Sequence, residues 1–182
     1  MFLRLVAVVV MTMLCSLAAA DQSDPRLEDL FKRLQSATSV AEAAPIEELI
    51  WQIWFEHSDS AIASRMATGV LQMNSGDLAG ALDTFDRLVQ DAPNFAEAWN
   101  RRATLHYQMG NYAASEADIA KVLQLEPFHF GALSGRGLVL ISQGQYEAAR
   151  NAFGRALEVH PNMPSVRNNI DEINRYLQSR TI

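Results

Sequence analysis

The fold of this chain is decided by the stretch AEAWNRRATLHYQMGNYAASEADIAKVLQLEPFH, residues 96–129, because its outline recurs on both sides. Its proline, Pro127, stands 34 residues after Pro93 and 34 residues before Pro161. The three copies of this outline are residues 62–95, 96–129 and 130–163. Each copy contains two helical patterns separated by a turn, and a single helix pair cannot bury its apolar faces alone. The copies are therefore expected to stack into one continuous solenoid core.

Three kinds of position recur within the copies. The fifteenth position is always glycine, which suits the end of the first helix, at Gly76, Gly110 and Gly144. Small residues hold the eighth and twentieth positions, at Gly69, Ala103, Gly137, Ala81, Ser115 and Ala149. The twenty-fourth position is large and apolar, at Phe85, Ile119 and Phe153. The pattern predicts two closely packed helices per copy, because larger side chains at the small positions would overpack the contact.

In this register, residues 62–163 resemble tetratricopeptide repeats, whose pattern has W, L, G and Y in the first helix and A, F, A and P in the second. The departures fall mostly in the first helices, where only Trp99 supplies the tryptophan and Arg65 and Leu133 replace it. The resemblance implies an all-α, right-handed α-solenoid of three helix pairs. The stretches 99–104 and 126–133 are also similar to small exported proteins of alphaproteobacteria.

Two helices are predicted before the repeats. Residues 25–35 fit the first, and Ser39 with Glu42 forms a capping box for a second helix that runs to about His57. Pro45 lies a turn inside the second helix, where it predicts a kink or a delayed start. Both helices belong to the segment 21–61, which is expected to pack on the solenoid, with one face covering the first repeat.

One further helix is predicted after the repeats, within residues 164–182. Its apolar residues recur at helical spacing and alternate with charged ones, at Val166, Ile170, Ile173 and Leu177. An amphipathic helix of this kind is expected to cap the last repeat, whose apolar face would otherwise be exposed.

Residues 1–20 are typical of a secretory signal peptide, with Arg4 near the start, an apolar run, and three alanines before Asp21. The predicted cut follows Ala20 and would place the protein in the bacterial periplasm. The alternative is an uncleaved membrane anchor, but the apolar run is shorter than the roughly 20 residues that a spanning helix needs. Cys15 is the only cysteine, and bulky residues precede it, which argues against a lipid-modified cysteine.

Charge and motif content point away from nucleic acid, metal ions and catalysis. The formal net charge is −6, whereas binding to nucleic acid requires a clustered basic face. The four histidines lack a second ligand-type residue at metal-like spacing: His57, His106, His129 and His160. No nucleophile elbow or phosphate-binding loop occurs in the sequence. We therefore expect no cofactor, no metal and no catalytic residue.

Function is expected instead on the concave groove that the first helices form in tetratricopeptide domains. The resemblance carries these candidate contacts onto the chain: Met66, Val70, Met73, Asn74, Glu97, Asn100, Arg101, Thr104, Tyr107, Gln108, Ser134, Leu138 and Ile141. A carboxylate clamp, with which chaperone-binding members grip a C-terminal peptide, fits poorly, because Met66 and Val70 stand where it needs polar or basic residues. The groove favours an apolar peptide or helix. The alternative is that Met66, Val70 and Leu138 belong to the core.

Trp51 and Trp54 form a second candidate contact surface, on the helix before the repeats. A partly exposed aromatic face would suit an interaction hot spot, whereas burial is the commoner fate of tryptophan. The sequence thus predicts an exported adaptor or scaffold that binds a protein or peptide in its groove. One alternative is a structural subunit of an envelope assembly, held through the terminal helices. The other is an enzyme whose site no motif reveals.

Overall fold

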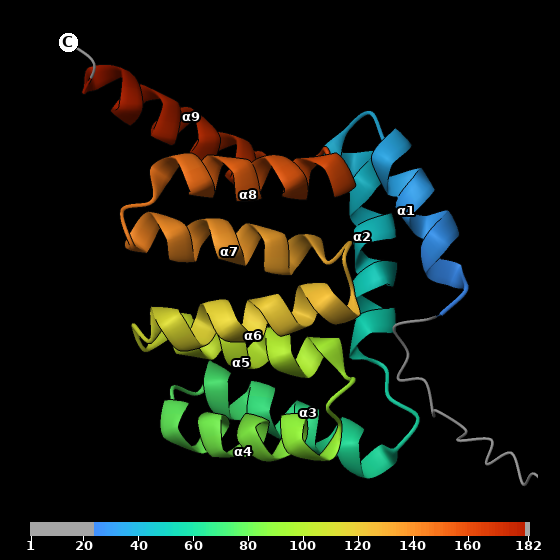
Figure 1. Ribbon diagram of the computed structural model, residues 1–182. Coiled ribbons are helices and arrows are strands. Elements are labelled where there is room, and N and C mark those ends of the chain that lie inside the picture. The colour runs from blue at the N-terminus through green and yellow to red at the C-terminus, as the bar shows by residue number, and fades with distance from the viewer. Residues whose placement is uncertain (1–23, 181–182) are drawn as a thin grey trace, which may run out of the picture.

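The computed structural model describes residues 24–180, which form nine α-helices and no strand (Figure 1). The helices are α1 (Arg26–Ser36), α2 (Val40–Phe55), α3 (Ser60–Asn74), α4 (Leu78–Asp91), α5 (Ala96–Gln108), α6 (Tyr112–Leu125), α7 (Phe130–Ser142), α8 (Tyr146–Val159) and α9 (Pro164–Ser179). The predicted all-α class is confirmed. The predicted signal peptide lies outside the described residues, and no helix between residues 24 and 180 is long and apolar enough to cross a membrane.

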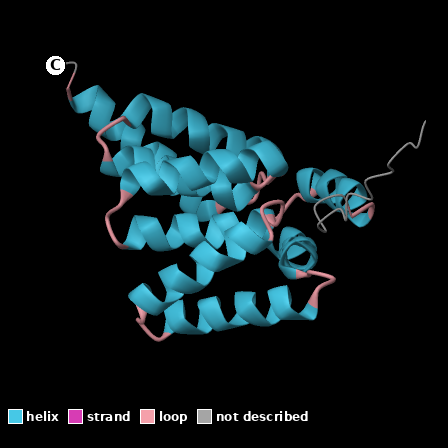
Figure 2. Cartoon of the chain, turned by 60° about the horizontal axis from the view of Figure 1, so that its bottom comes forward, coloured by secondary structure: helices cyan, strands magenta, loops and turns pink. Residues whose placement is uncertain are grey.

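The three predicted repeats are the helix pairs α3–α4, α5–α6 and α7–α8, which stack in chain order (Figure 1). Each pair turns at its predicted glycine, and these glycines have positive φ angles of 83°, 76° and 72° at Gly76, Gly110 and Gly144. The residue after each glycine donates its N–H to a carbonyl five residues earlier, as Asn111 does to His106 at 2.8 Å. This is the Schellman pattern of helix ends, so a short loop joins the two helices of each pair (Figure 2).

The small eighth position of each repeat faces the large twenty-fourth position of the partner helix. A Cβ atom on Gly69 would lie 2.8 Å from Cε1 of Phe85, and one on Gly137 would lie closer still to Phe153. The middle repeat combines alanine with the smaller isoleucine at the equivalent positions. In each helix pair, a small residue on the first helix is therefore matched to a larger one on the second. The small residues at the eighth position predicted this close packing.

The first two helices form a hairpin that lies along one edge of the stack, where the turns between repeats meet. Figure 1 shows α2 running across the ends of α5, α7 and α8 at a steep angle. Trp54 is fully buried, and its ring stacks on that of His129 with centroids 4.0 Å apart and planes 8° apart. Ile50 and Trp54 share one core cluster with Phe153 of the third repeat.

This placement corrects the expectation that α2 covers the first repeat. Of the α2 residues, only Phe55 packs against the core cluster of that repeat. The outer face of α3 is left uncovered, so Leu71 is 69% exposed while Leu105, at the same repeat position, is completely buried. The apolar face of α2 packs instead on the turn before α7, where Trp54 contacts the rings of His129 and Phe130 and is completely buried.

The flanking helices occupy the residues that the sequence assigned to them. The N-terminal end of α2 is capped by Ser39, whose hydroxyl accepts the N–H of Glu42. Pro45 lies inside the helix, which starts at Val40 without delay. At the other end, α9 buries Val166 and Ile173 and packs on α8, as a capping helix should.

Candidate functional site

A cavity of about 200 Å³ lies between α5 and α7, on the face of the stack that these first helices form. Its walls are supplied by α5 and α7 and its floor by α6: Asn100, Ala103, Thr104, Tyr107, Ser115, Ile119, Gly131, Ser134, Gly135 and Leu138. Five of these are candidate groove residues from the sequence, namely Asn100, Thr104, Tyr107, Ser134 and Leu138. The structure therefore brings together residues that are up to 38 positions apart (138 − 100 = 38).

Other candidate residues do not reach this cavity. Met66 and Trp54 are 2% and 0% exposed, so they offer no surface to a ligand and belong to the core. Val70 and Met73 are partly buried against the first-repeat core, and Ile141 against the third. Asn74 and Gln108 are exposed at the far ends of their helices. The groove residues of the first repeat thus contribute mainly to packing.

Glu97 is a completely buried carboxylate at the start of α5. It accepts hydrogen bonds from Nδ2 of Asn100 at 2.9 Å and from Nε of Arg101 at 2.6 Å. Nε2 of His129 lies 3.0 Å from Oε2 of Glu97, the same oxygen that accepts from Asn100. Because three partners surround it, this buried charge is hydrogen-bonded and paired, as a carboxylate inside a protein must be.

His129 links this carboxylate to the start of α7. Its Nδ1 accepts the backbone N–H of Ala132 at 3.1 Å, and so caps the helix. An accepting Nδ1 carries no proton, so Nε2 carries the proton of the neutral imidazole and donates it to Glu97. His129, whose ring stacks on Trp54, is therefore a neutral helix cap. From the sequence it was expected only to lie in a turn.

Arg101 is held away from the cavity by groups of the chain itself. Besides its bond to Glu97, its guanidinium lies 4.5 Å from the ring centroid of Phe55 and 5.8 Å from that of Trp51. Trp51 in turn contacts the cavity wall: a Cβ on Gly131 would lie 2.6 Å from Cη2 of its indole. The hairpin thus borders one end of the cavity, and Gly131 is needed for that contact.

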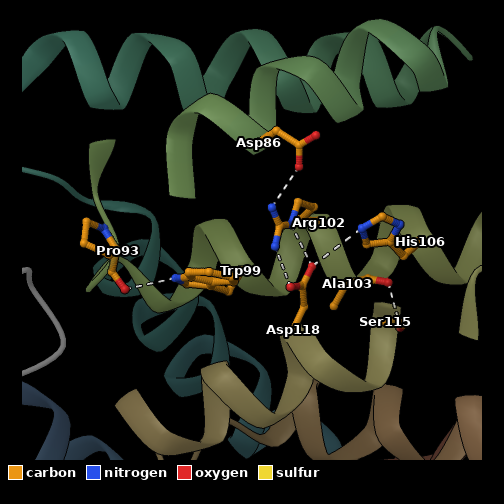
Figure 3. Close-up of polar contacts among 8 residues, drawn as sticks. All are labelled: Asp86, Pro93, Trp99, Arg102, Ala103, His106, Ser115 and Asp118. Atoms are coloured by element: carbon orange, nitrogen blue, oxygen red, sulfur yellow. Dashed lines mark hydrogen bonds and ion pairs between the residues drawn. The ribbon is translucent and has the colours of Figure 1, made fainter. Parts of the chain in front are cut away.

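Arg102 ties three helices together behind the groove (Figure 3). Its guanidinium donates to both carboxylate oxygens of Asp118, at 2.8 and 2.7 Å, and to Asp86 of the preceding repeat at 2.8 Å. Asp118 also raises the pKa of this guanidinium. At the same position of the next repeat, Arg136 bonds to Glu116. Arginine at the same position of two repeats was the signal in the sequence that could have revealed these ion pairs.

Two buried or partly buried carboxylates lie where the hairpin meets the turns between repeats. Burial raises the pKa of Glu126, although the N–H of Phe128 opposes this effect by donating to it. Glu47 of α2 accepts a hydrogen bond from His160 at 3.1 Å, which lowers its pKa. Across residues 24–180, no three His, Cys, Asp or Glu side chains are grouped to hold a metal ion.

Comparison with known proteins agrees with this architecture. The family described as tetratricopeptide repeat matches residues 66–130 and 100–165. A TPR repeat-containing protein of Rhizobium etli is 35% identical over 143 residues, which are 79% of this chain and 70% of that protein. DnaJ homolog subfamily C member 3 of Homo sapiens is 32% identical over 100 residues, which are 55% of this chain and only 20% of that protein.

Among solved structures, the first TPR domain of Spaghetti (RPAP3), bound to the HSP90 peptide SRMEEVD, has a similar fold. The TM-score is 0.63 at 22% sequence identity, over 66% of this chain and 96% of that chain. At this identity the likeness concerns the fold alone. The family match covers more than half of the sequence, and the Rhizobium etli relative is 35% identical over 79% of the chain. The chain therefore belongs to the tetratricopeptide repeat family.

Proposed function

We propose that this protein is an exported adaptor that binds a peptide segment of another protein in the groove between α5 and α7. The observation that carries the proposal is the cavity itself, which five residues at the groove positions of the family line together. The fold neighbour described above holds a peptide, which supports a binding role for this architecture. The groove acts by capture alone, without chemistry on the bound segment.

Export is supported by the sequence of residues 1–20, and we propose the periplasm as the site of action. Fractionation of cells that produce the full chain tests this part separately. The protein is expected in the periplasmic fraction, with an N-terminus that begins at Asp21. Recovery from the cytoplasm with Met1 still present would contradict export and leave the binding function to be judged on its own.

Gly135 offers a direct test of the groove. It lines the cavity, and a Cβ at this position would meet no atom within 4 Å. Gly135→Leu should therefore fill the cavity without a clash, and it should also favour the helix because leucine is the better helix former. Gly154→Leu is the matched control, since Gly154 lies in α8, away from the cavity, and is equally free of neighbours.

The measurement is affinity capture from an envelope extract, with the two variants and the unchanged protein compared side by side. A protein retained by the unchanged chain and by the Gly154 variant, and lost with Gly135→Leu, would support the groove. Equal capture by all three would contradict it. Thermal unfolding of each variant establishes that the comparison is between folded proteins.

A structural role in an envelope assembly is the second candidate, and one observation favours it. Phe128 is 54% exposed in the turn before α7, and its ring lies 5.7 Å from that of Phe31 of α1. The two rings belong to a surface hollow of about 520 Å³ between the hairpin and this turn. If this surface holds the assembly, Phe128→Ser should abolish capture while Gly135→Leu leaves it intact.

A further inference from the structure

Every cationic side chain on the three helices of the groove is already paired with a carboxylate of this chain. On α3, α5 and α7, which the structure describes in full, the pairs are Arg65 with Asp91, Arg101 with Glu97, Arg102 with Asp86 and Asp118, and Arg136 with Glu116. A ligand carboxylate would have to compete with these internal partners for the guanidinium groups. The groove therefore offers no cation that is ready to receive an acidic peptide.

Among these arginines, Arg101 is the one that the resemblance makes compatible with a carboxylate clamp, and diverting it from its internal partner would be costly. Its partner Glu97 is completely buried, so losing the guanidinium would leave a buried charge with less compensation. The rings of Phe55 and Trp51 also lie against the guanidinium. Binding energy from a ligand carboxylate would thus be offset by the cost of opening this cluster.

Three of the five polar side chains that line the cavity are likewise occupied. The hydroxyl of Thr104 donates to the carbonyl of Asn100 at 2.9 Å, and that of Ser115 donates to the carbonyl of Ala103 at 2.8 Å. The amide of Asn100 donates to Glu97. What these residues leave for a ligand is mostly carbon surface, together with that of Leu138 and Ile119.

From this we infer the chemical class of the ligand: an uncharged segment of a protein that inserts an apolar side chain into the cavity between α5 and α7. Peptides that end in acidic residues, such as the SRMEEVD bound by the Spaghetti domain, are expected to bind more weakly. The inference rests on the peptide-binding function proposed above and names its ligand. Burial of apolar surface drives the association, and the fully described groove helices offer no unpaired arginine to compensate a ligand carboxylate.

Panning of random dodecapeptide libraries against the purified protein tests the ligand class. One library should display peptides with a free C-terminus and the other with both ends blocked by fusion. Enriched sequences are expected to be apolar, free of Asp and Glu, and equally frequent in both libraries. Enrichment of sequences with acidic C-termini would overturn the ligand class but leave peptide binding standing. Enrichment of nothing in either library would overturn the binding function and the class together.

Fluorescence anisotropy then compares the best enriched peptide with labelled SRMEEVD. The acidic peptide is expected to bind at least about tenfold more weakly, and the neutral peptide should keep its Kd between about 0.05 and 0.5 M salt, because screening acts on charges. Gly135→Leu should weaken the neutral peptide at least about tenfold, while Gly154→Leu leaves it unchanged. SRMEEVD binding within about tenfold of the neutral peptide would overturn the inference.

Discussion

Gly137 and Phe153 share a single packing site, in which the aromatic ring occupies the space where a Cβ of residue 137 would lie. That Cβ would be 2.5 Å from Cζ of Phe153, and the ring is completely buried. Gly137→Ala should therefore destabilise the protein by about 1–3 kcal/mol through overpacking, measured by urea unfolding.

The middle repeat suggests how to rescue this variant, because it pairs Ala103 with Ile119 at the same two positions. The double variant Gly137→Ala, Phe153→Ile should recover part of the lost stability, so that the two changes are not additive. Strict additivity of the two single effects would contradict a shared packing site.

Leu71 and Leu105 occupy the same repeat position and should differ sharply in their contribution to stability. Leu105 is completely buried between repeats, so Leu105→Ala should cost about 2–5 kcal/mol of the free energy of unfolding. Leu71 is exposed on the uncovered face of α3, and Leu71→Ala should change stability by less than about 0.5 kcal/mol. Urea unfolding of the two variants checks both values, and similar costs would mean that α3 is covered.

Glu126 should make the stability of the protein fall as pH rises. Its pKa is raised by burial, so between its ordinary value and its raised value the folded state binds more protons than the unfolded state. Glu126→Gln keeps an acceptor for the N–H of Phe128 and removes the buried charge. The variant should be more stable than the unchanged protein at pH 7, and the difference should vanish below about pH 4.

Urea unfolding at several pH values measures this effect. Glu48→Gln, an exposed change on α2, serves as the matched control and should show no such advantage at neutral pH. A Glu126→Gln variant that is less stable than the unchanged protein at pH 7 would show that the carboxylate is stabilising in the folded state.

Arg102 should contribute through its bond to Asp118, which is almost completely buried. Arg102→Met leaves that carboxylate without its bidentate partner and should cost about 3 kcal/mol or more. The double variant with Asp118→Asn should cost less than the sum of the two single changes, because no buried charge then remains. A loss below about 1 kcal/mol for Arg102→Met would indicate that solvent screens the pair.

The repeats could be predicted because their signals are local in the sequence. A turn glycine such as Gly110 acts through its own backbone, and the sizes of Gly137 and Phe153 are matched within one helix pair. The register of the prolines therefore determined three helix pairs, onto which the family resemblance carried the candidate groove positions. Five of those positions line one cavity in the folded chain.

The position of α2 could not be predicted in the same way. Trp54 packs on His129, which is 75 residues later (129 − 54 = 75), and neither residue belongs to a repeating pattern that names its partner. The choice depends on how much apolar surface each part of the array leaves uncovered, and that is a property of the assembled stack. The same reason explains why Leu71 is exposed while Leu105 is buried.

The sequence by itself thus determined the repeats and their turns, because these follow from short-range periodicity and side-chain size. Only the tertiary structure decided which groove residues remain accessible and which charges are already paired. Glu97 and Arg101 are groove positions by sequence and lie four residues apart on α5, and His129, Phe55 and Trp51 from other parts of the chain enclose their ion pair beside the cavity. This burial depends on neighbours that are distant in the sequence and meet only when the array and its hairpin are assembled.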